Sequence, residues 1–210
     1  MERLQDLLIE YNTSHQSNFD ENEWALQFCE DNFPLYWRIV FSIAQKLPQN
    51  SNIIEIGACY GFITAIFIYL KMLNIKGYES NKVLAEQGNT LLYKMFGTKN
   101  IILPEKYKYQ QENANVLVIV NCAYADECNT KAQYMEHLKK YYSSCGQPKH
   151  LILEVIDSSY KEVDDEIPLI IRLSKNDIKK MFPNCRIQTW ETYKFPKNKK
   201  SKTLYLIEAI

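Results

Sequence analysis

The stretch Ile53-Ile-Glu-Ile-Gly-Ala-Cys-Tyr-Gly-Phe-Ile-Thr-Ala65 decides the fold of this chain. Its first four residues form a short apolar run around Glu55, which predicts a buried strand. Gly57 and Gly61 predict a tight turn after that strand, and the apolar residues that follow predict a helix. A strand that passes through a glycine turn into a helix exposes backbone N–H groups, and a nucleotide-like ligand can approach the backbone closely there.

The charge beside the turn separates two kinds of ligand. A dinucleotide-binding turn has the pattern G-x-G-x-x-G, whereas here the glycines follow G-x-x-x-G and Glu55 precedes them. A carboxylate in this place repels a pyrophosphate and attracts a cationic ligand. Glu79 ends the next predicted strand, where an acid can accept hydrogen bonds from the ribose hydroxyls of an adenosine. Together the two acids favour an adenosine ligand with a positive charge, as S-adenosylmethionine has at its sulfonium and amino groups.

Short apolar runs and amphipathic segments alternate from this stretch to the C-terminus. The sequence predicts strands at 53–56, 75–78, 100–103, 116–120, 150–156, 186–193 and 203–210, and helices at 61–73, 82–96, 130–142 and 175–181. This alternation predicts a mostly parallel sheet with helices on both faces. Only a short loop separates the last two strands, so they are expected to form a hairpin. The expected fold class is α/β: a Rossmann-like, seven-stranded, mostly parallel sheet with a C-terminal antiparallel hairpin strand.

The first 47 residues have a different pattern. Leu4, Leu8 and Tyr11 recur at helical spacing, and further helices are expected near Asp20 and after Pro34. We therefore expect an N-terminal helical extension at 1–47, as a candidate lid, and a Rossmann-like domain at 48–210. Several aromatic residues of the extension serve either as core or as part of the lid: Phe19, Trp24, Phe28, Phe33, Tyr36 and Trp37.

The segment Glu55-x-Gly57-Ala58-x-x-Gly61-Phe62-x-Thr64 resembles motif I of the class I S-adenosylmethionine-dependent methyltransferases, in the form of the catechol-type small-molecule O-methyltransferases. The resemblance implies that S-adenosylmethionine is the cofactor, with Glu55 near its amino group and Glu79 on its ribose. The cofactor-binding residues expected are Glu55, Gly57, Ala58, Cys59, Gly61, Phe62, Glu79, Ser80 and Asn121. The sequence departs from the common G-x-G-x-G form at Cys59, and no clear acid follows the third predicted strand to hold the adenine.

Residues for the transfer step are expected after the fourth predicted strand, because open α/β sheets bind ligands beyond the carboxyl ends of their strands. Asn121 and Tyr124 keep the spacing of the N-P-P-Y motif of amino-group methyltransferases, although Cys122 and Ala123 replace both prolines. The alternative is a strand-end turn with a buried tyrosine. His15, in a segment that could fold over the site, is a candidate general base.

A metal ion is not expected. Catechol-type enzymes bind a divalent metal through acids after the fourth and fifth strands, but here Asn121 follows the fourth. Glu154 and Asp157, near the fifth, do not match the pattern. The lysine-rich run at 197–202 is expected to be a solvated hairpin loop.

The balance of charge restricts the partners. Lys and Arg total 25 and Asp and Glu total 25, so no overall field attracts nucleic acid or an anionic membrane. No signal peptide or bilayer-spanning run is visible, and the six cysteines contain no C-x-x-C pair. These features predict a cytoplasmic protein with free thiols and no metal.

The expected function is direct methyl transfer from S-adenosylmethionine to an amine or hydroxyl of a small molecule or peptide. Nucleic acid is not the expected substrate, and a homodimer is left open. One alternative is a catalytically silent methyltransferase-like binding or partner subunit. The other is a different transferase with the same cofactor, for example one that transfers an aminocarboxypropyl group.

Overall fold

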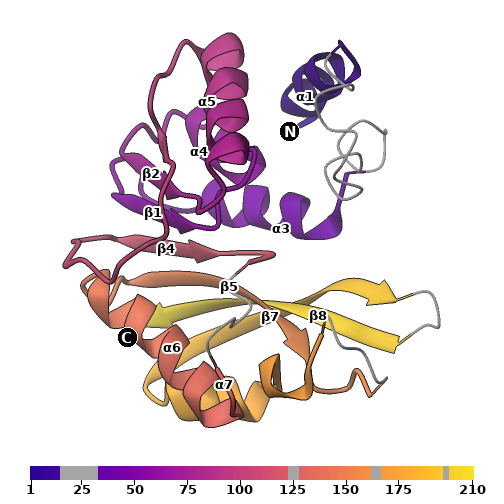
Figure 1. The fold of residues 1–210 in the computed structure, drawn as a ribbon, viewed down its shortest axis with the longest axis vertical. Coiled ribbons are helices and arrows are strands. Elements are labelled where there is room, and N and C mark those ends of the chain that lie inside the picture. The colour runs from indigo at the N-terminus through magenta and orange to yellow at the C-terminus, as the bar shows by residue number, and fades with distance from the viewer. Residues whose placement is uncertain (15–32, 123–127, 162–166, 196–198) are drawn as a thin grey trace. The chain divides into compact units, whose positions relative to one another are not determined.

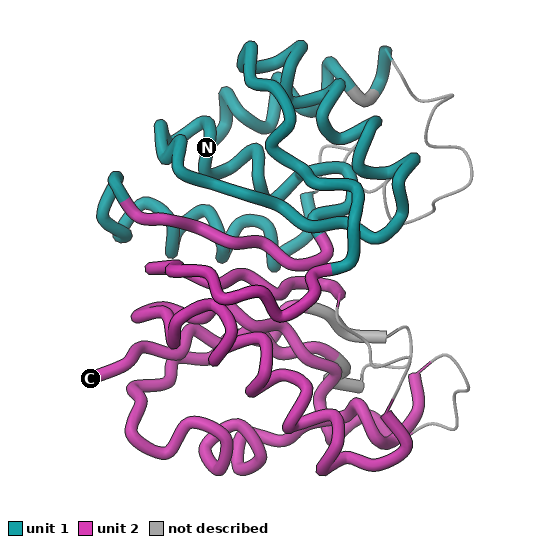
Figure 2. Tube along the Cα trace, turned by 60° about the vertical axis from the view of Figure 1, so that its left-hand side comes forward, with its two compact units in different colours: residues 1–50, 58–106 teal, residues 51–57, 107–210 magenta. Residues whose placement is uncertain are grey.

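The computed structural model describes residues 1–14, 33–122, 128–161, 167–195 and 199–210 (Figure 1). The chain has two compact units, one of residues 1–50 and 58–106 and the other of residues 51–57 and 107–210 (Figure 2). The boundary expected near residue 47, and the role of the segment before it as a lid, stay predictions.

The first unit contains four described helices and two strands: α1 (Glu2–Ser14), α3 (Leu35–Ala44), α4 (Phe62–Tyr69), α5 (Lys82–Phe96), β2 (Ile75–Tyr78) and β3 (Ile102–Leu103). The strands pair in parallel, with Gly77 opposite Ile102. Helix α4 is buried from Phe62 to Ile68, as expected for a helix whose only polar residue in that stretch is Thr64. Trp37 of α3 is fully buried, and its Nε1 donates to the carbonyl oxygen of Phe62 at 2.9 Å. Helix α3 is thereby attached to the first turn of α4.

The second unit contains six strands, two α-helices and one 3-10 helix: β1 (Ile53–Ile56), β4 (Val116–Ile119), α6 (Lys131–Ser144), β5 (His150–Asp157), η2 (Leu169–Ile171), β6 (Arg172–Leu173), α7 (Lys175–Met181), β7 (Cys185–Phe195) and β8 (Lys199–Ala209). Strands β1, β4 and β5 are parallel neighbours in that order. Strand β8 lies antiparallel between β5 and β7. All residues of β1 and β4 are buried, and each strand is mostly Val, Ile or Leu, as is typical of a buried parallel strand.

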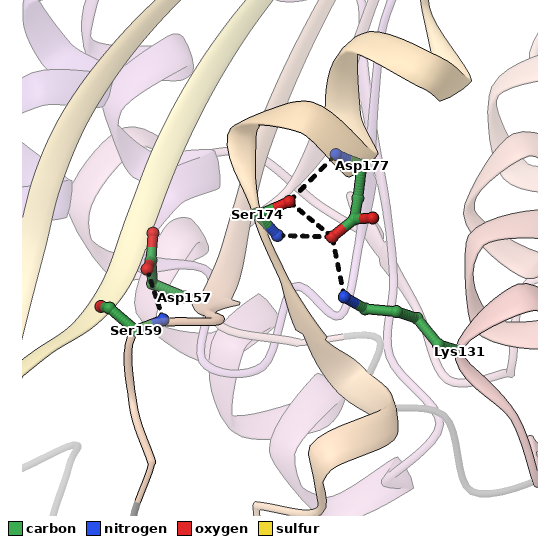
Figure 3. A network of polar contacts seen from close by, with 5 residues as sticks. All are labelled: Lys131, Asp157, Ser159, Ser174 and Asp177. Carbon is green, nitrogen blue, oxygen red and sulfur yellow. Dashed lines mark hydrogen bonds and ion pairs between the residues drawn. The ribbon is translucent and has the colours of Figure 1, made fainter.

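Two polar contacts fix α7 at its N-terminus. The Ser174 side chain accepts from the backbone N–H of Asp177, and the Asp177 carboxylate accepts from the backbone N–H of Ser174, which is a reciprocal capping box. Lys131, in the first turn of α6, donates to the same Asp177 carboxylate at 2.8 Å (Figure 3). The ion pair therefore joins the starts of α6 and α7.

The expected α/β fold, with mostly parallel strands and an antiparallel hairpin at the end of the chain, is confirmed. The strand count was wrong, because the described residues form eight strands and not seven. The additional strand is β6, whose two residues pair with the end of β5. Two residues are too short for a periodic pattern, so the sequence carries no signal for β6. Among the described residues, none of the helices has both the length and the apolarity needed to cross a bilayer.

Candidate functional site

The turn that leads into α4 has left-handed backbone at three places. Gly57 and Gly61 both have φ of +75°, and Cys59 has φ of +48°. The backbone N–H of Ala58 donates to the carbonyl oxygen of Tyr78 at 3.0 Å, which attaches the turn to the end of β2. Gly61 is the N-cap of α4, and as a glycine it has no side chain to accept from the first N–H groups of the helix. The N-terminus of α4 therefore has backbone groups but no capping side chain.

Gly61 has φ of +75°, which L side chains rarely adopt, and close packing adds to this constraint. An alanine methyl group there would lie 2.9 Å from Ile102 Cδ1, inside the normal contact distance. Gly88, in the middle of α5, has the same constraint, because a methyl group would lie 3.0 Å from the carbonyl oxygen of Cys59. Both glycines let neighbouring elements approach the turn closely.

Glu79, at the end of β2, is bound to the turn by its side chain. Its Oε2 accepts from the backbone N–H of Cys59 at 2.9 Å, and its Oε1 accepts from the backbone N–H of Asn81 at 2.8 Å. The residue is only 9% exposed. Ser80, which follows it, is exposed, and its hydroxyl lies 3.5 Å from Oε1. The structure thus brings together two elements that the sequence singled out separately, the glycine turn and the acid of the second strand.

Cys59 occupies the position of the middle glycine in the G-x-G-x-G form. Its backbone is left-handed, a conformation that is unfavourable for most residues other than Gly, Asn and Asp. The N–H of Cys59 still donates to Glu79. With cysteine at this position, the turn thus has a left-handed residue whose N–H binds the Glu79 carboxylate.

In the second unit, the end of β1 contacts the segment after β4. Cys122 donates from its thiol to the carbonyl oxygen of Ile56. A methyl group on Gly57 would lie 2.3 Å from Cys122 Cβ and 2.6 Å from its Sγ. The side chain of Cys122 therefore covers Gly57, and the segment after β4 lies against the start of the glycine turn. Glu55, which lies two residues before Gly57 in β1, is only 3% exposed.

A partly buried polar cluster surrounds Asn121, which lies two residues after the end of β4. Asn121 has φ of +54°, and its side-chain oxygen accepts from Lys202 Nζ of β8. Glu154 of β5 is buried and accepts from the Thr192 hydroxyl of β7. Burial raises the pKa of Glu154, although Lys202, Thr192 and the Asn121 backbone amide act in the opposite direction. Burial lowers the pKa of Lys202, and the negative charge of Glu154 opposes that change.

Lys202 is the residue that sequence reasoning missed. The lysine-rich run at 197–202 predicted a solvated loop, and for Lys202 that prediction was wrong. The residue belongs to β8 and is partly buried, and it lies opposite Ile156 of β5 in the antiparallel register. Its position at the C-terminal end of the lysine run was the only sequence feature that could have indicated its partial burial.

The remaining predicted site residues have the following positions. Ala58 and Phe62 are buried, and the Phe62 ring lies 5.9 Å from that of Tyr60. Tyr124 and His15 lie outside the described residues, so their roles stay predictions. The cofactor-binding roles of the other residues are likewise not tested by their positions alone.

The acids near the end of β5 have protein partners. Asp157 accepts from the Thr203 hydroxyl at 2.9 Å. It also accepts from the backbone N–H of Ser159 at 2.8 Å (Figure 3). Within the part of the chain that the structure describes, no group of three or more His, Cys, Asp or Glu side chains is arranged to hold a metal ion.

No protein-family model and no curated protein matches this sequence. Solved structures do match the fold. Magnesium protoporphyrin IX methyltransferase (ChlM) from Synechocystis PCC 6803 with bound S-adenosylmethionine has a TM-score of 0.64 and 11% identity, over 98% of this chain and 97% of that chain. TehB from Haemophilus influenzae has a TM-score of 0.61 and 13% identity, over 89% of this chain and 66% of that chain.

A third match is the methyltransferase domain of bacterial CtHen1-C, with a TM-score of 0.59 and 8% identity over 83% of this chain and 97% of that chain. Identities this low carry information about the fold and not about the substrate. The chain therefore has the fold of the class I S-adenosylmethionine-dependent methyltransferases.

Proposed function

We propose that this protein is an S-adenosylmethionine-dependent methyltransferase acting on a small molecule or peptide. The observation that carries the proposal is the attachment of the Glu79 carboxylate to the backbone of the glycine turn. A carboxylate can accept about four hydrogen bonds, so Glu79 can hold its two backbone partners and still accept from ribose hydroxyls. The acid is therefore oriented before the ligand arrives, which reduces the entropy cost of binding.

The charge and shape of the turn support the same ligand. The left-handed glycines let a ligand approach the backbone, and Glu55 precedes them in the chain. A sulfonium and an amino group are attracted by such an acid, whereas a pyrophosphate is repelled. We propose that Gly57, Ala58, Cys59, Gly61, Phe62 and Ser80 complete the cofactor site.

The transfer step needs the acceptor atom in line with the sulfonium methyl group, and positioning alone can supply a large part of the rate. Asn121 is suited to this role because it follows β4 at its carboxyl end. Cys122, the next residue, covers Gly57. The proposed acceptor site and the start of the proposed cofactor turn are thus neighbours in the second unit. No disulfide joins any of the five cysteines of the described residues, which is consistent with a reducing compartment such as the cytoplasm.

The test is a calorimetric titration of the purified protein with S-adenosylmethionine and S-adenosylhomocysteine, with NAD as the ligand control. The sample variants are Glu79→Ala and Glu86→Ala, because Glu86 is an exposed acid on α5 of the same unit. We expect both sulfur ligands to bind the parent protein and the Glu86 variant with equal affinity. We expect Glu79→Ala to lose binding and NAD not to bind.

Failure of both sulfur ligands to bind folded protein would contradict the proposal. That result would instead favour the catalytically silent subunit, for which Cys59 in a glycine position is the structural argument. If the sulfur ligands bind, product analysis distinguishes methyl transfer from aminocarboxypropyl transfer.

A further inference from the structure

The cation of Lys202 lies where the proposed methyl acceptor would bind. Lys202 Nζ donates to the side-chain oxygen of Asn121, which lies two residues after the end of β4. Strand β4 lies between β1 and β5, so this position is at the carboxyl end of an inner parallel strand. Ligands of open α/β sheets bind at these ends.

The contact also fixes how Asn121 can act. A lysine ammonium is only a donor, so the Asn121 amide must turn its oxygen and not its nitrogen toward Nζ. An amine substrate would use that same oxygen as the acceptor for its N–H group. Lys202 occupies one of the two acceptor positions of that oxygen, which leaves a single position for such a donor.

Charge adds a second argument against an amine. An alkylamine is mostly an ammonium ion at neutral pH, and a like charge at Lys202 repels it. An anionic acceptor is attracted instead. Among the described residues, Lys202 Nζ donates to the Asn121 amide oxygen, and the buried Glu154 carboxylate and the Cys122 thiol act on its charge. The negative charge of Glu154 partly cancels the positive charge of Lys202, so it determines how strongly Lys202 attracts or repels an incoming ligand.

We infer that the methyl acceptor of this protein is a carboxylate, which the Lys202 ammonium group binds beside Asn121 at the carboxyl end of β4. The inference rests on the proposed methyltransferase function and specifies its substrate class. It departs from the amine or hydroxyl that the sequence favoured.

The reaction balances without a base. One carboxylate oxygen forms a bond to the methyl carbon, and the bond from that carbon to sulfur breaks with its electron pair going to the sulfur. The products are a methyl ester and neutral S-adenosylhomocysteine. A carboxylate is already deprotonated at neutral pH, so no proton has to be removed. The described residues can therefore perform this transfer by binding and alignment alone.

The experiment measures acceptor binding to protein saturated with S-adenosylhomocysteine. The probes are benzoate and benzylamine, which have similar size and opposite charge. Four variants are compared with the parent: Lys202→Met, Lys202→Arg, Glu154→Gln and, as the matched control, Lys180→Met, which removes an exposed lysine of α7. Thermal melting of each variant establishes that it is folded.

We expect the parent to bind benzoate at least tenfold more tightly than benzylamine. Lys202→Met should weaken benzoate binding at least tenfold, whereas Lys202→Arg and Lys180→Met should retain it. Glu154→Gln should strengthen benzoate binding, because it removes the negative charge beside Lys202. A purely structural role for the pair predicts that Lys202→Met and Glu154→Gln change binding in the same direction.

The inference is overturned if benzoate binds no more tightly than benzylamine to the parent, or if Lys202→Met binds benzoate like the parent. All folded variants should bind S-adenosylhomocysteine with the parent's affinity. Failure of the parent protein to bind S-adenosylhomocysteine would contradict the proposed function itself, so the two failures are distinguishable.

Discussion

The carboxylate of Glu79 accepts a hydrogen bond from the backbone N–H of Cys59 at 2.9 Å. The contact joins the end of β2 to the turn before α4, and both belong to the first unit. An acid held in this way both stabilises the turn and presents its remaining lone pairs in a fixed direction. Substitution of this acid should therefore affect both the stability of the turn and the binding of a ligand.

Glu79→Gln should affect stability and cofactor binding together. A glutamine side chain has one oxygen and one NH₂ group, so one of the two backbone donors, at Cys59 or Asn81, would face another donor. We expect the free energy of unfolding to fall by about 1–3 kcal/mol, measured by urea denaturation. Affinity for S-adenosylmethionine should fall by roughly tenfold or more, since a weaker ribose acceptor remains. Parent-like affinity in this variant would contradict the ribose-binding role, and Glu86→Gln is the control.

Gly57→Ala should be much more destabilising than Gly97→Ala. The two glycines have nearly the same φ, +75° and +71°, so the backbone strain in the two variants is matched. A methyl group on Gly97 meets nothing within 4 Å, whereas one on Gly57 meets Cys122 Cβ at 2.3 Å. We expect Gly97→Ala to cost about 1 kcal/mol and Gly57→Ala about 1–3 kcal/mol more.

Urea denaturation of both variants checks this difference. Cys122→Gly removes the atoms that the new methyl group would meet, so the double variant with Gly57→Ala should recover part of the loss. Equal effects of Gly57→Ala and Gly97→Ala would show that Cys122 does not cover Gly57.

Cys59→Gly should stabilise the protein slightly. The substitution restores a glycine where φ is +48°, and it keeps the N–H that donates to Glu79. Relief of the left-handed strain outweighs the greater freedom of glycine in the unfolded chain, so we expect a gain of between zero and about 1 kcal/mol. Lys71→Gly is a matched control, because Lys71 is exposed and has φ of +64°. Thermal melting gives the measurement, and a clear loss of stability in Cys59→Gly alone would argue for an essential contact of the thiol.

The ion pair between Lys131 and Asp177 should give a defined acid dependence of stability. Partial burial alone would raise the pKa of Asp177, but the hydrogen bonds from Lys131 and Ser174 outweigh it and lower the pKa from 3.8 to about 2. A depressed folded-state pKa contributes stability that is complete above the unfolded value and is lost as the pH falls through the folded value. We expect Asp177→Asn to cost about 1 kcal/mol at neutral pH.

Urea denaturation of the parent and of Asp177→Asn as a function of pH tests this expectation. The difference between them should shrink as the pH falls from about 4 to about 2, because the parent loses its ion pair over that interval. Glu136→Gln, which changes an exposed ion pair with Lys139 on α6, should show little difference at any pH. A constant difference between parent and Asp177→Asn would contradict the ionic contribution.

The parts of the fold that the sequence predicted depend on local patterns. The order strand, glycine turn and helix around Gly57 could be read from adjacent residues, and so could the final hairpin. The position of Lys202 could not. It depends on a contact with Asn121, which lies 81 residues earlier, and on the register of β8 against β5. A shift of one residue in that register would have turned Lys202 to the other face of the strand.

The same distinction applies to the candidate site. Glu79 and the glycine turn follow two consecutive predicted strands, so their spacing suggested their proximity, and in the first unit Glu79 does contact Cys59. Glu154 lies near the end of a predicted strand, but its partner Thr192 comes from β7, 38 residues away. Only the folded sheet shows that Glu154 is buried beside Lys202, and because of this burial the two charges affect each other.

The hydrogen bond from Trp37 to the Phe62 carbonyl gives the first unit an internal optical reporter. The indole of Trp37 is fully shielded from water, and its N–H is attached to the first turn of the helix that follows the glycine turn. Its fluorescence should be emitted at short wavelength and should resist quenching by iodide. In a protein whose Trp24 and Trp190 are replaced by phenylalanine, the colour of that emission follows the state of this helix turn without any added label.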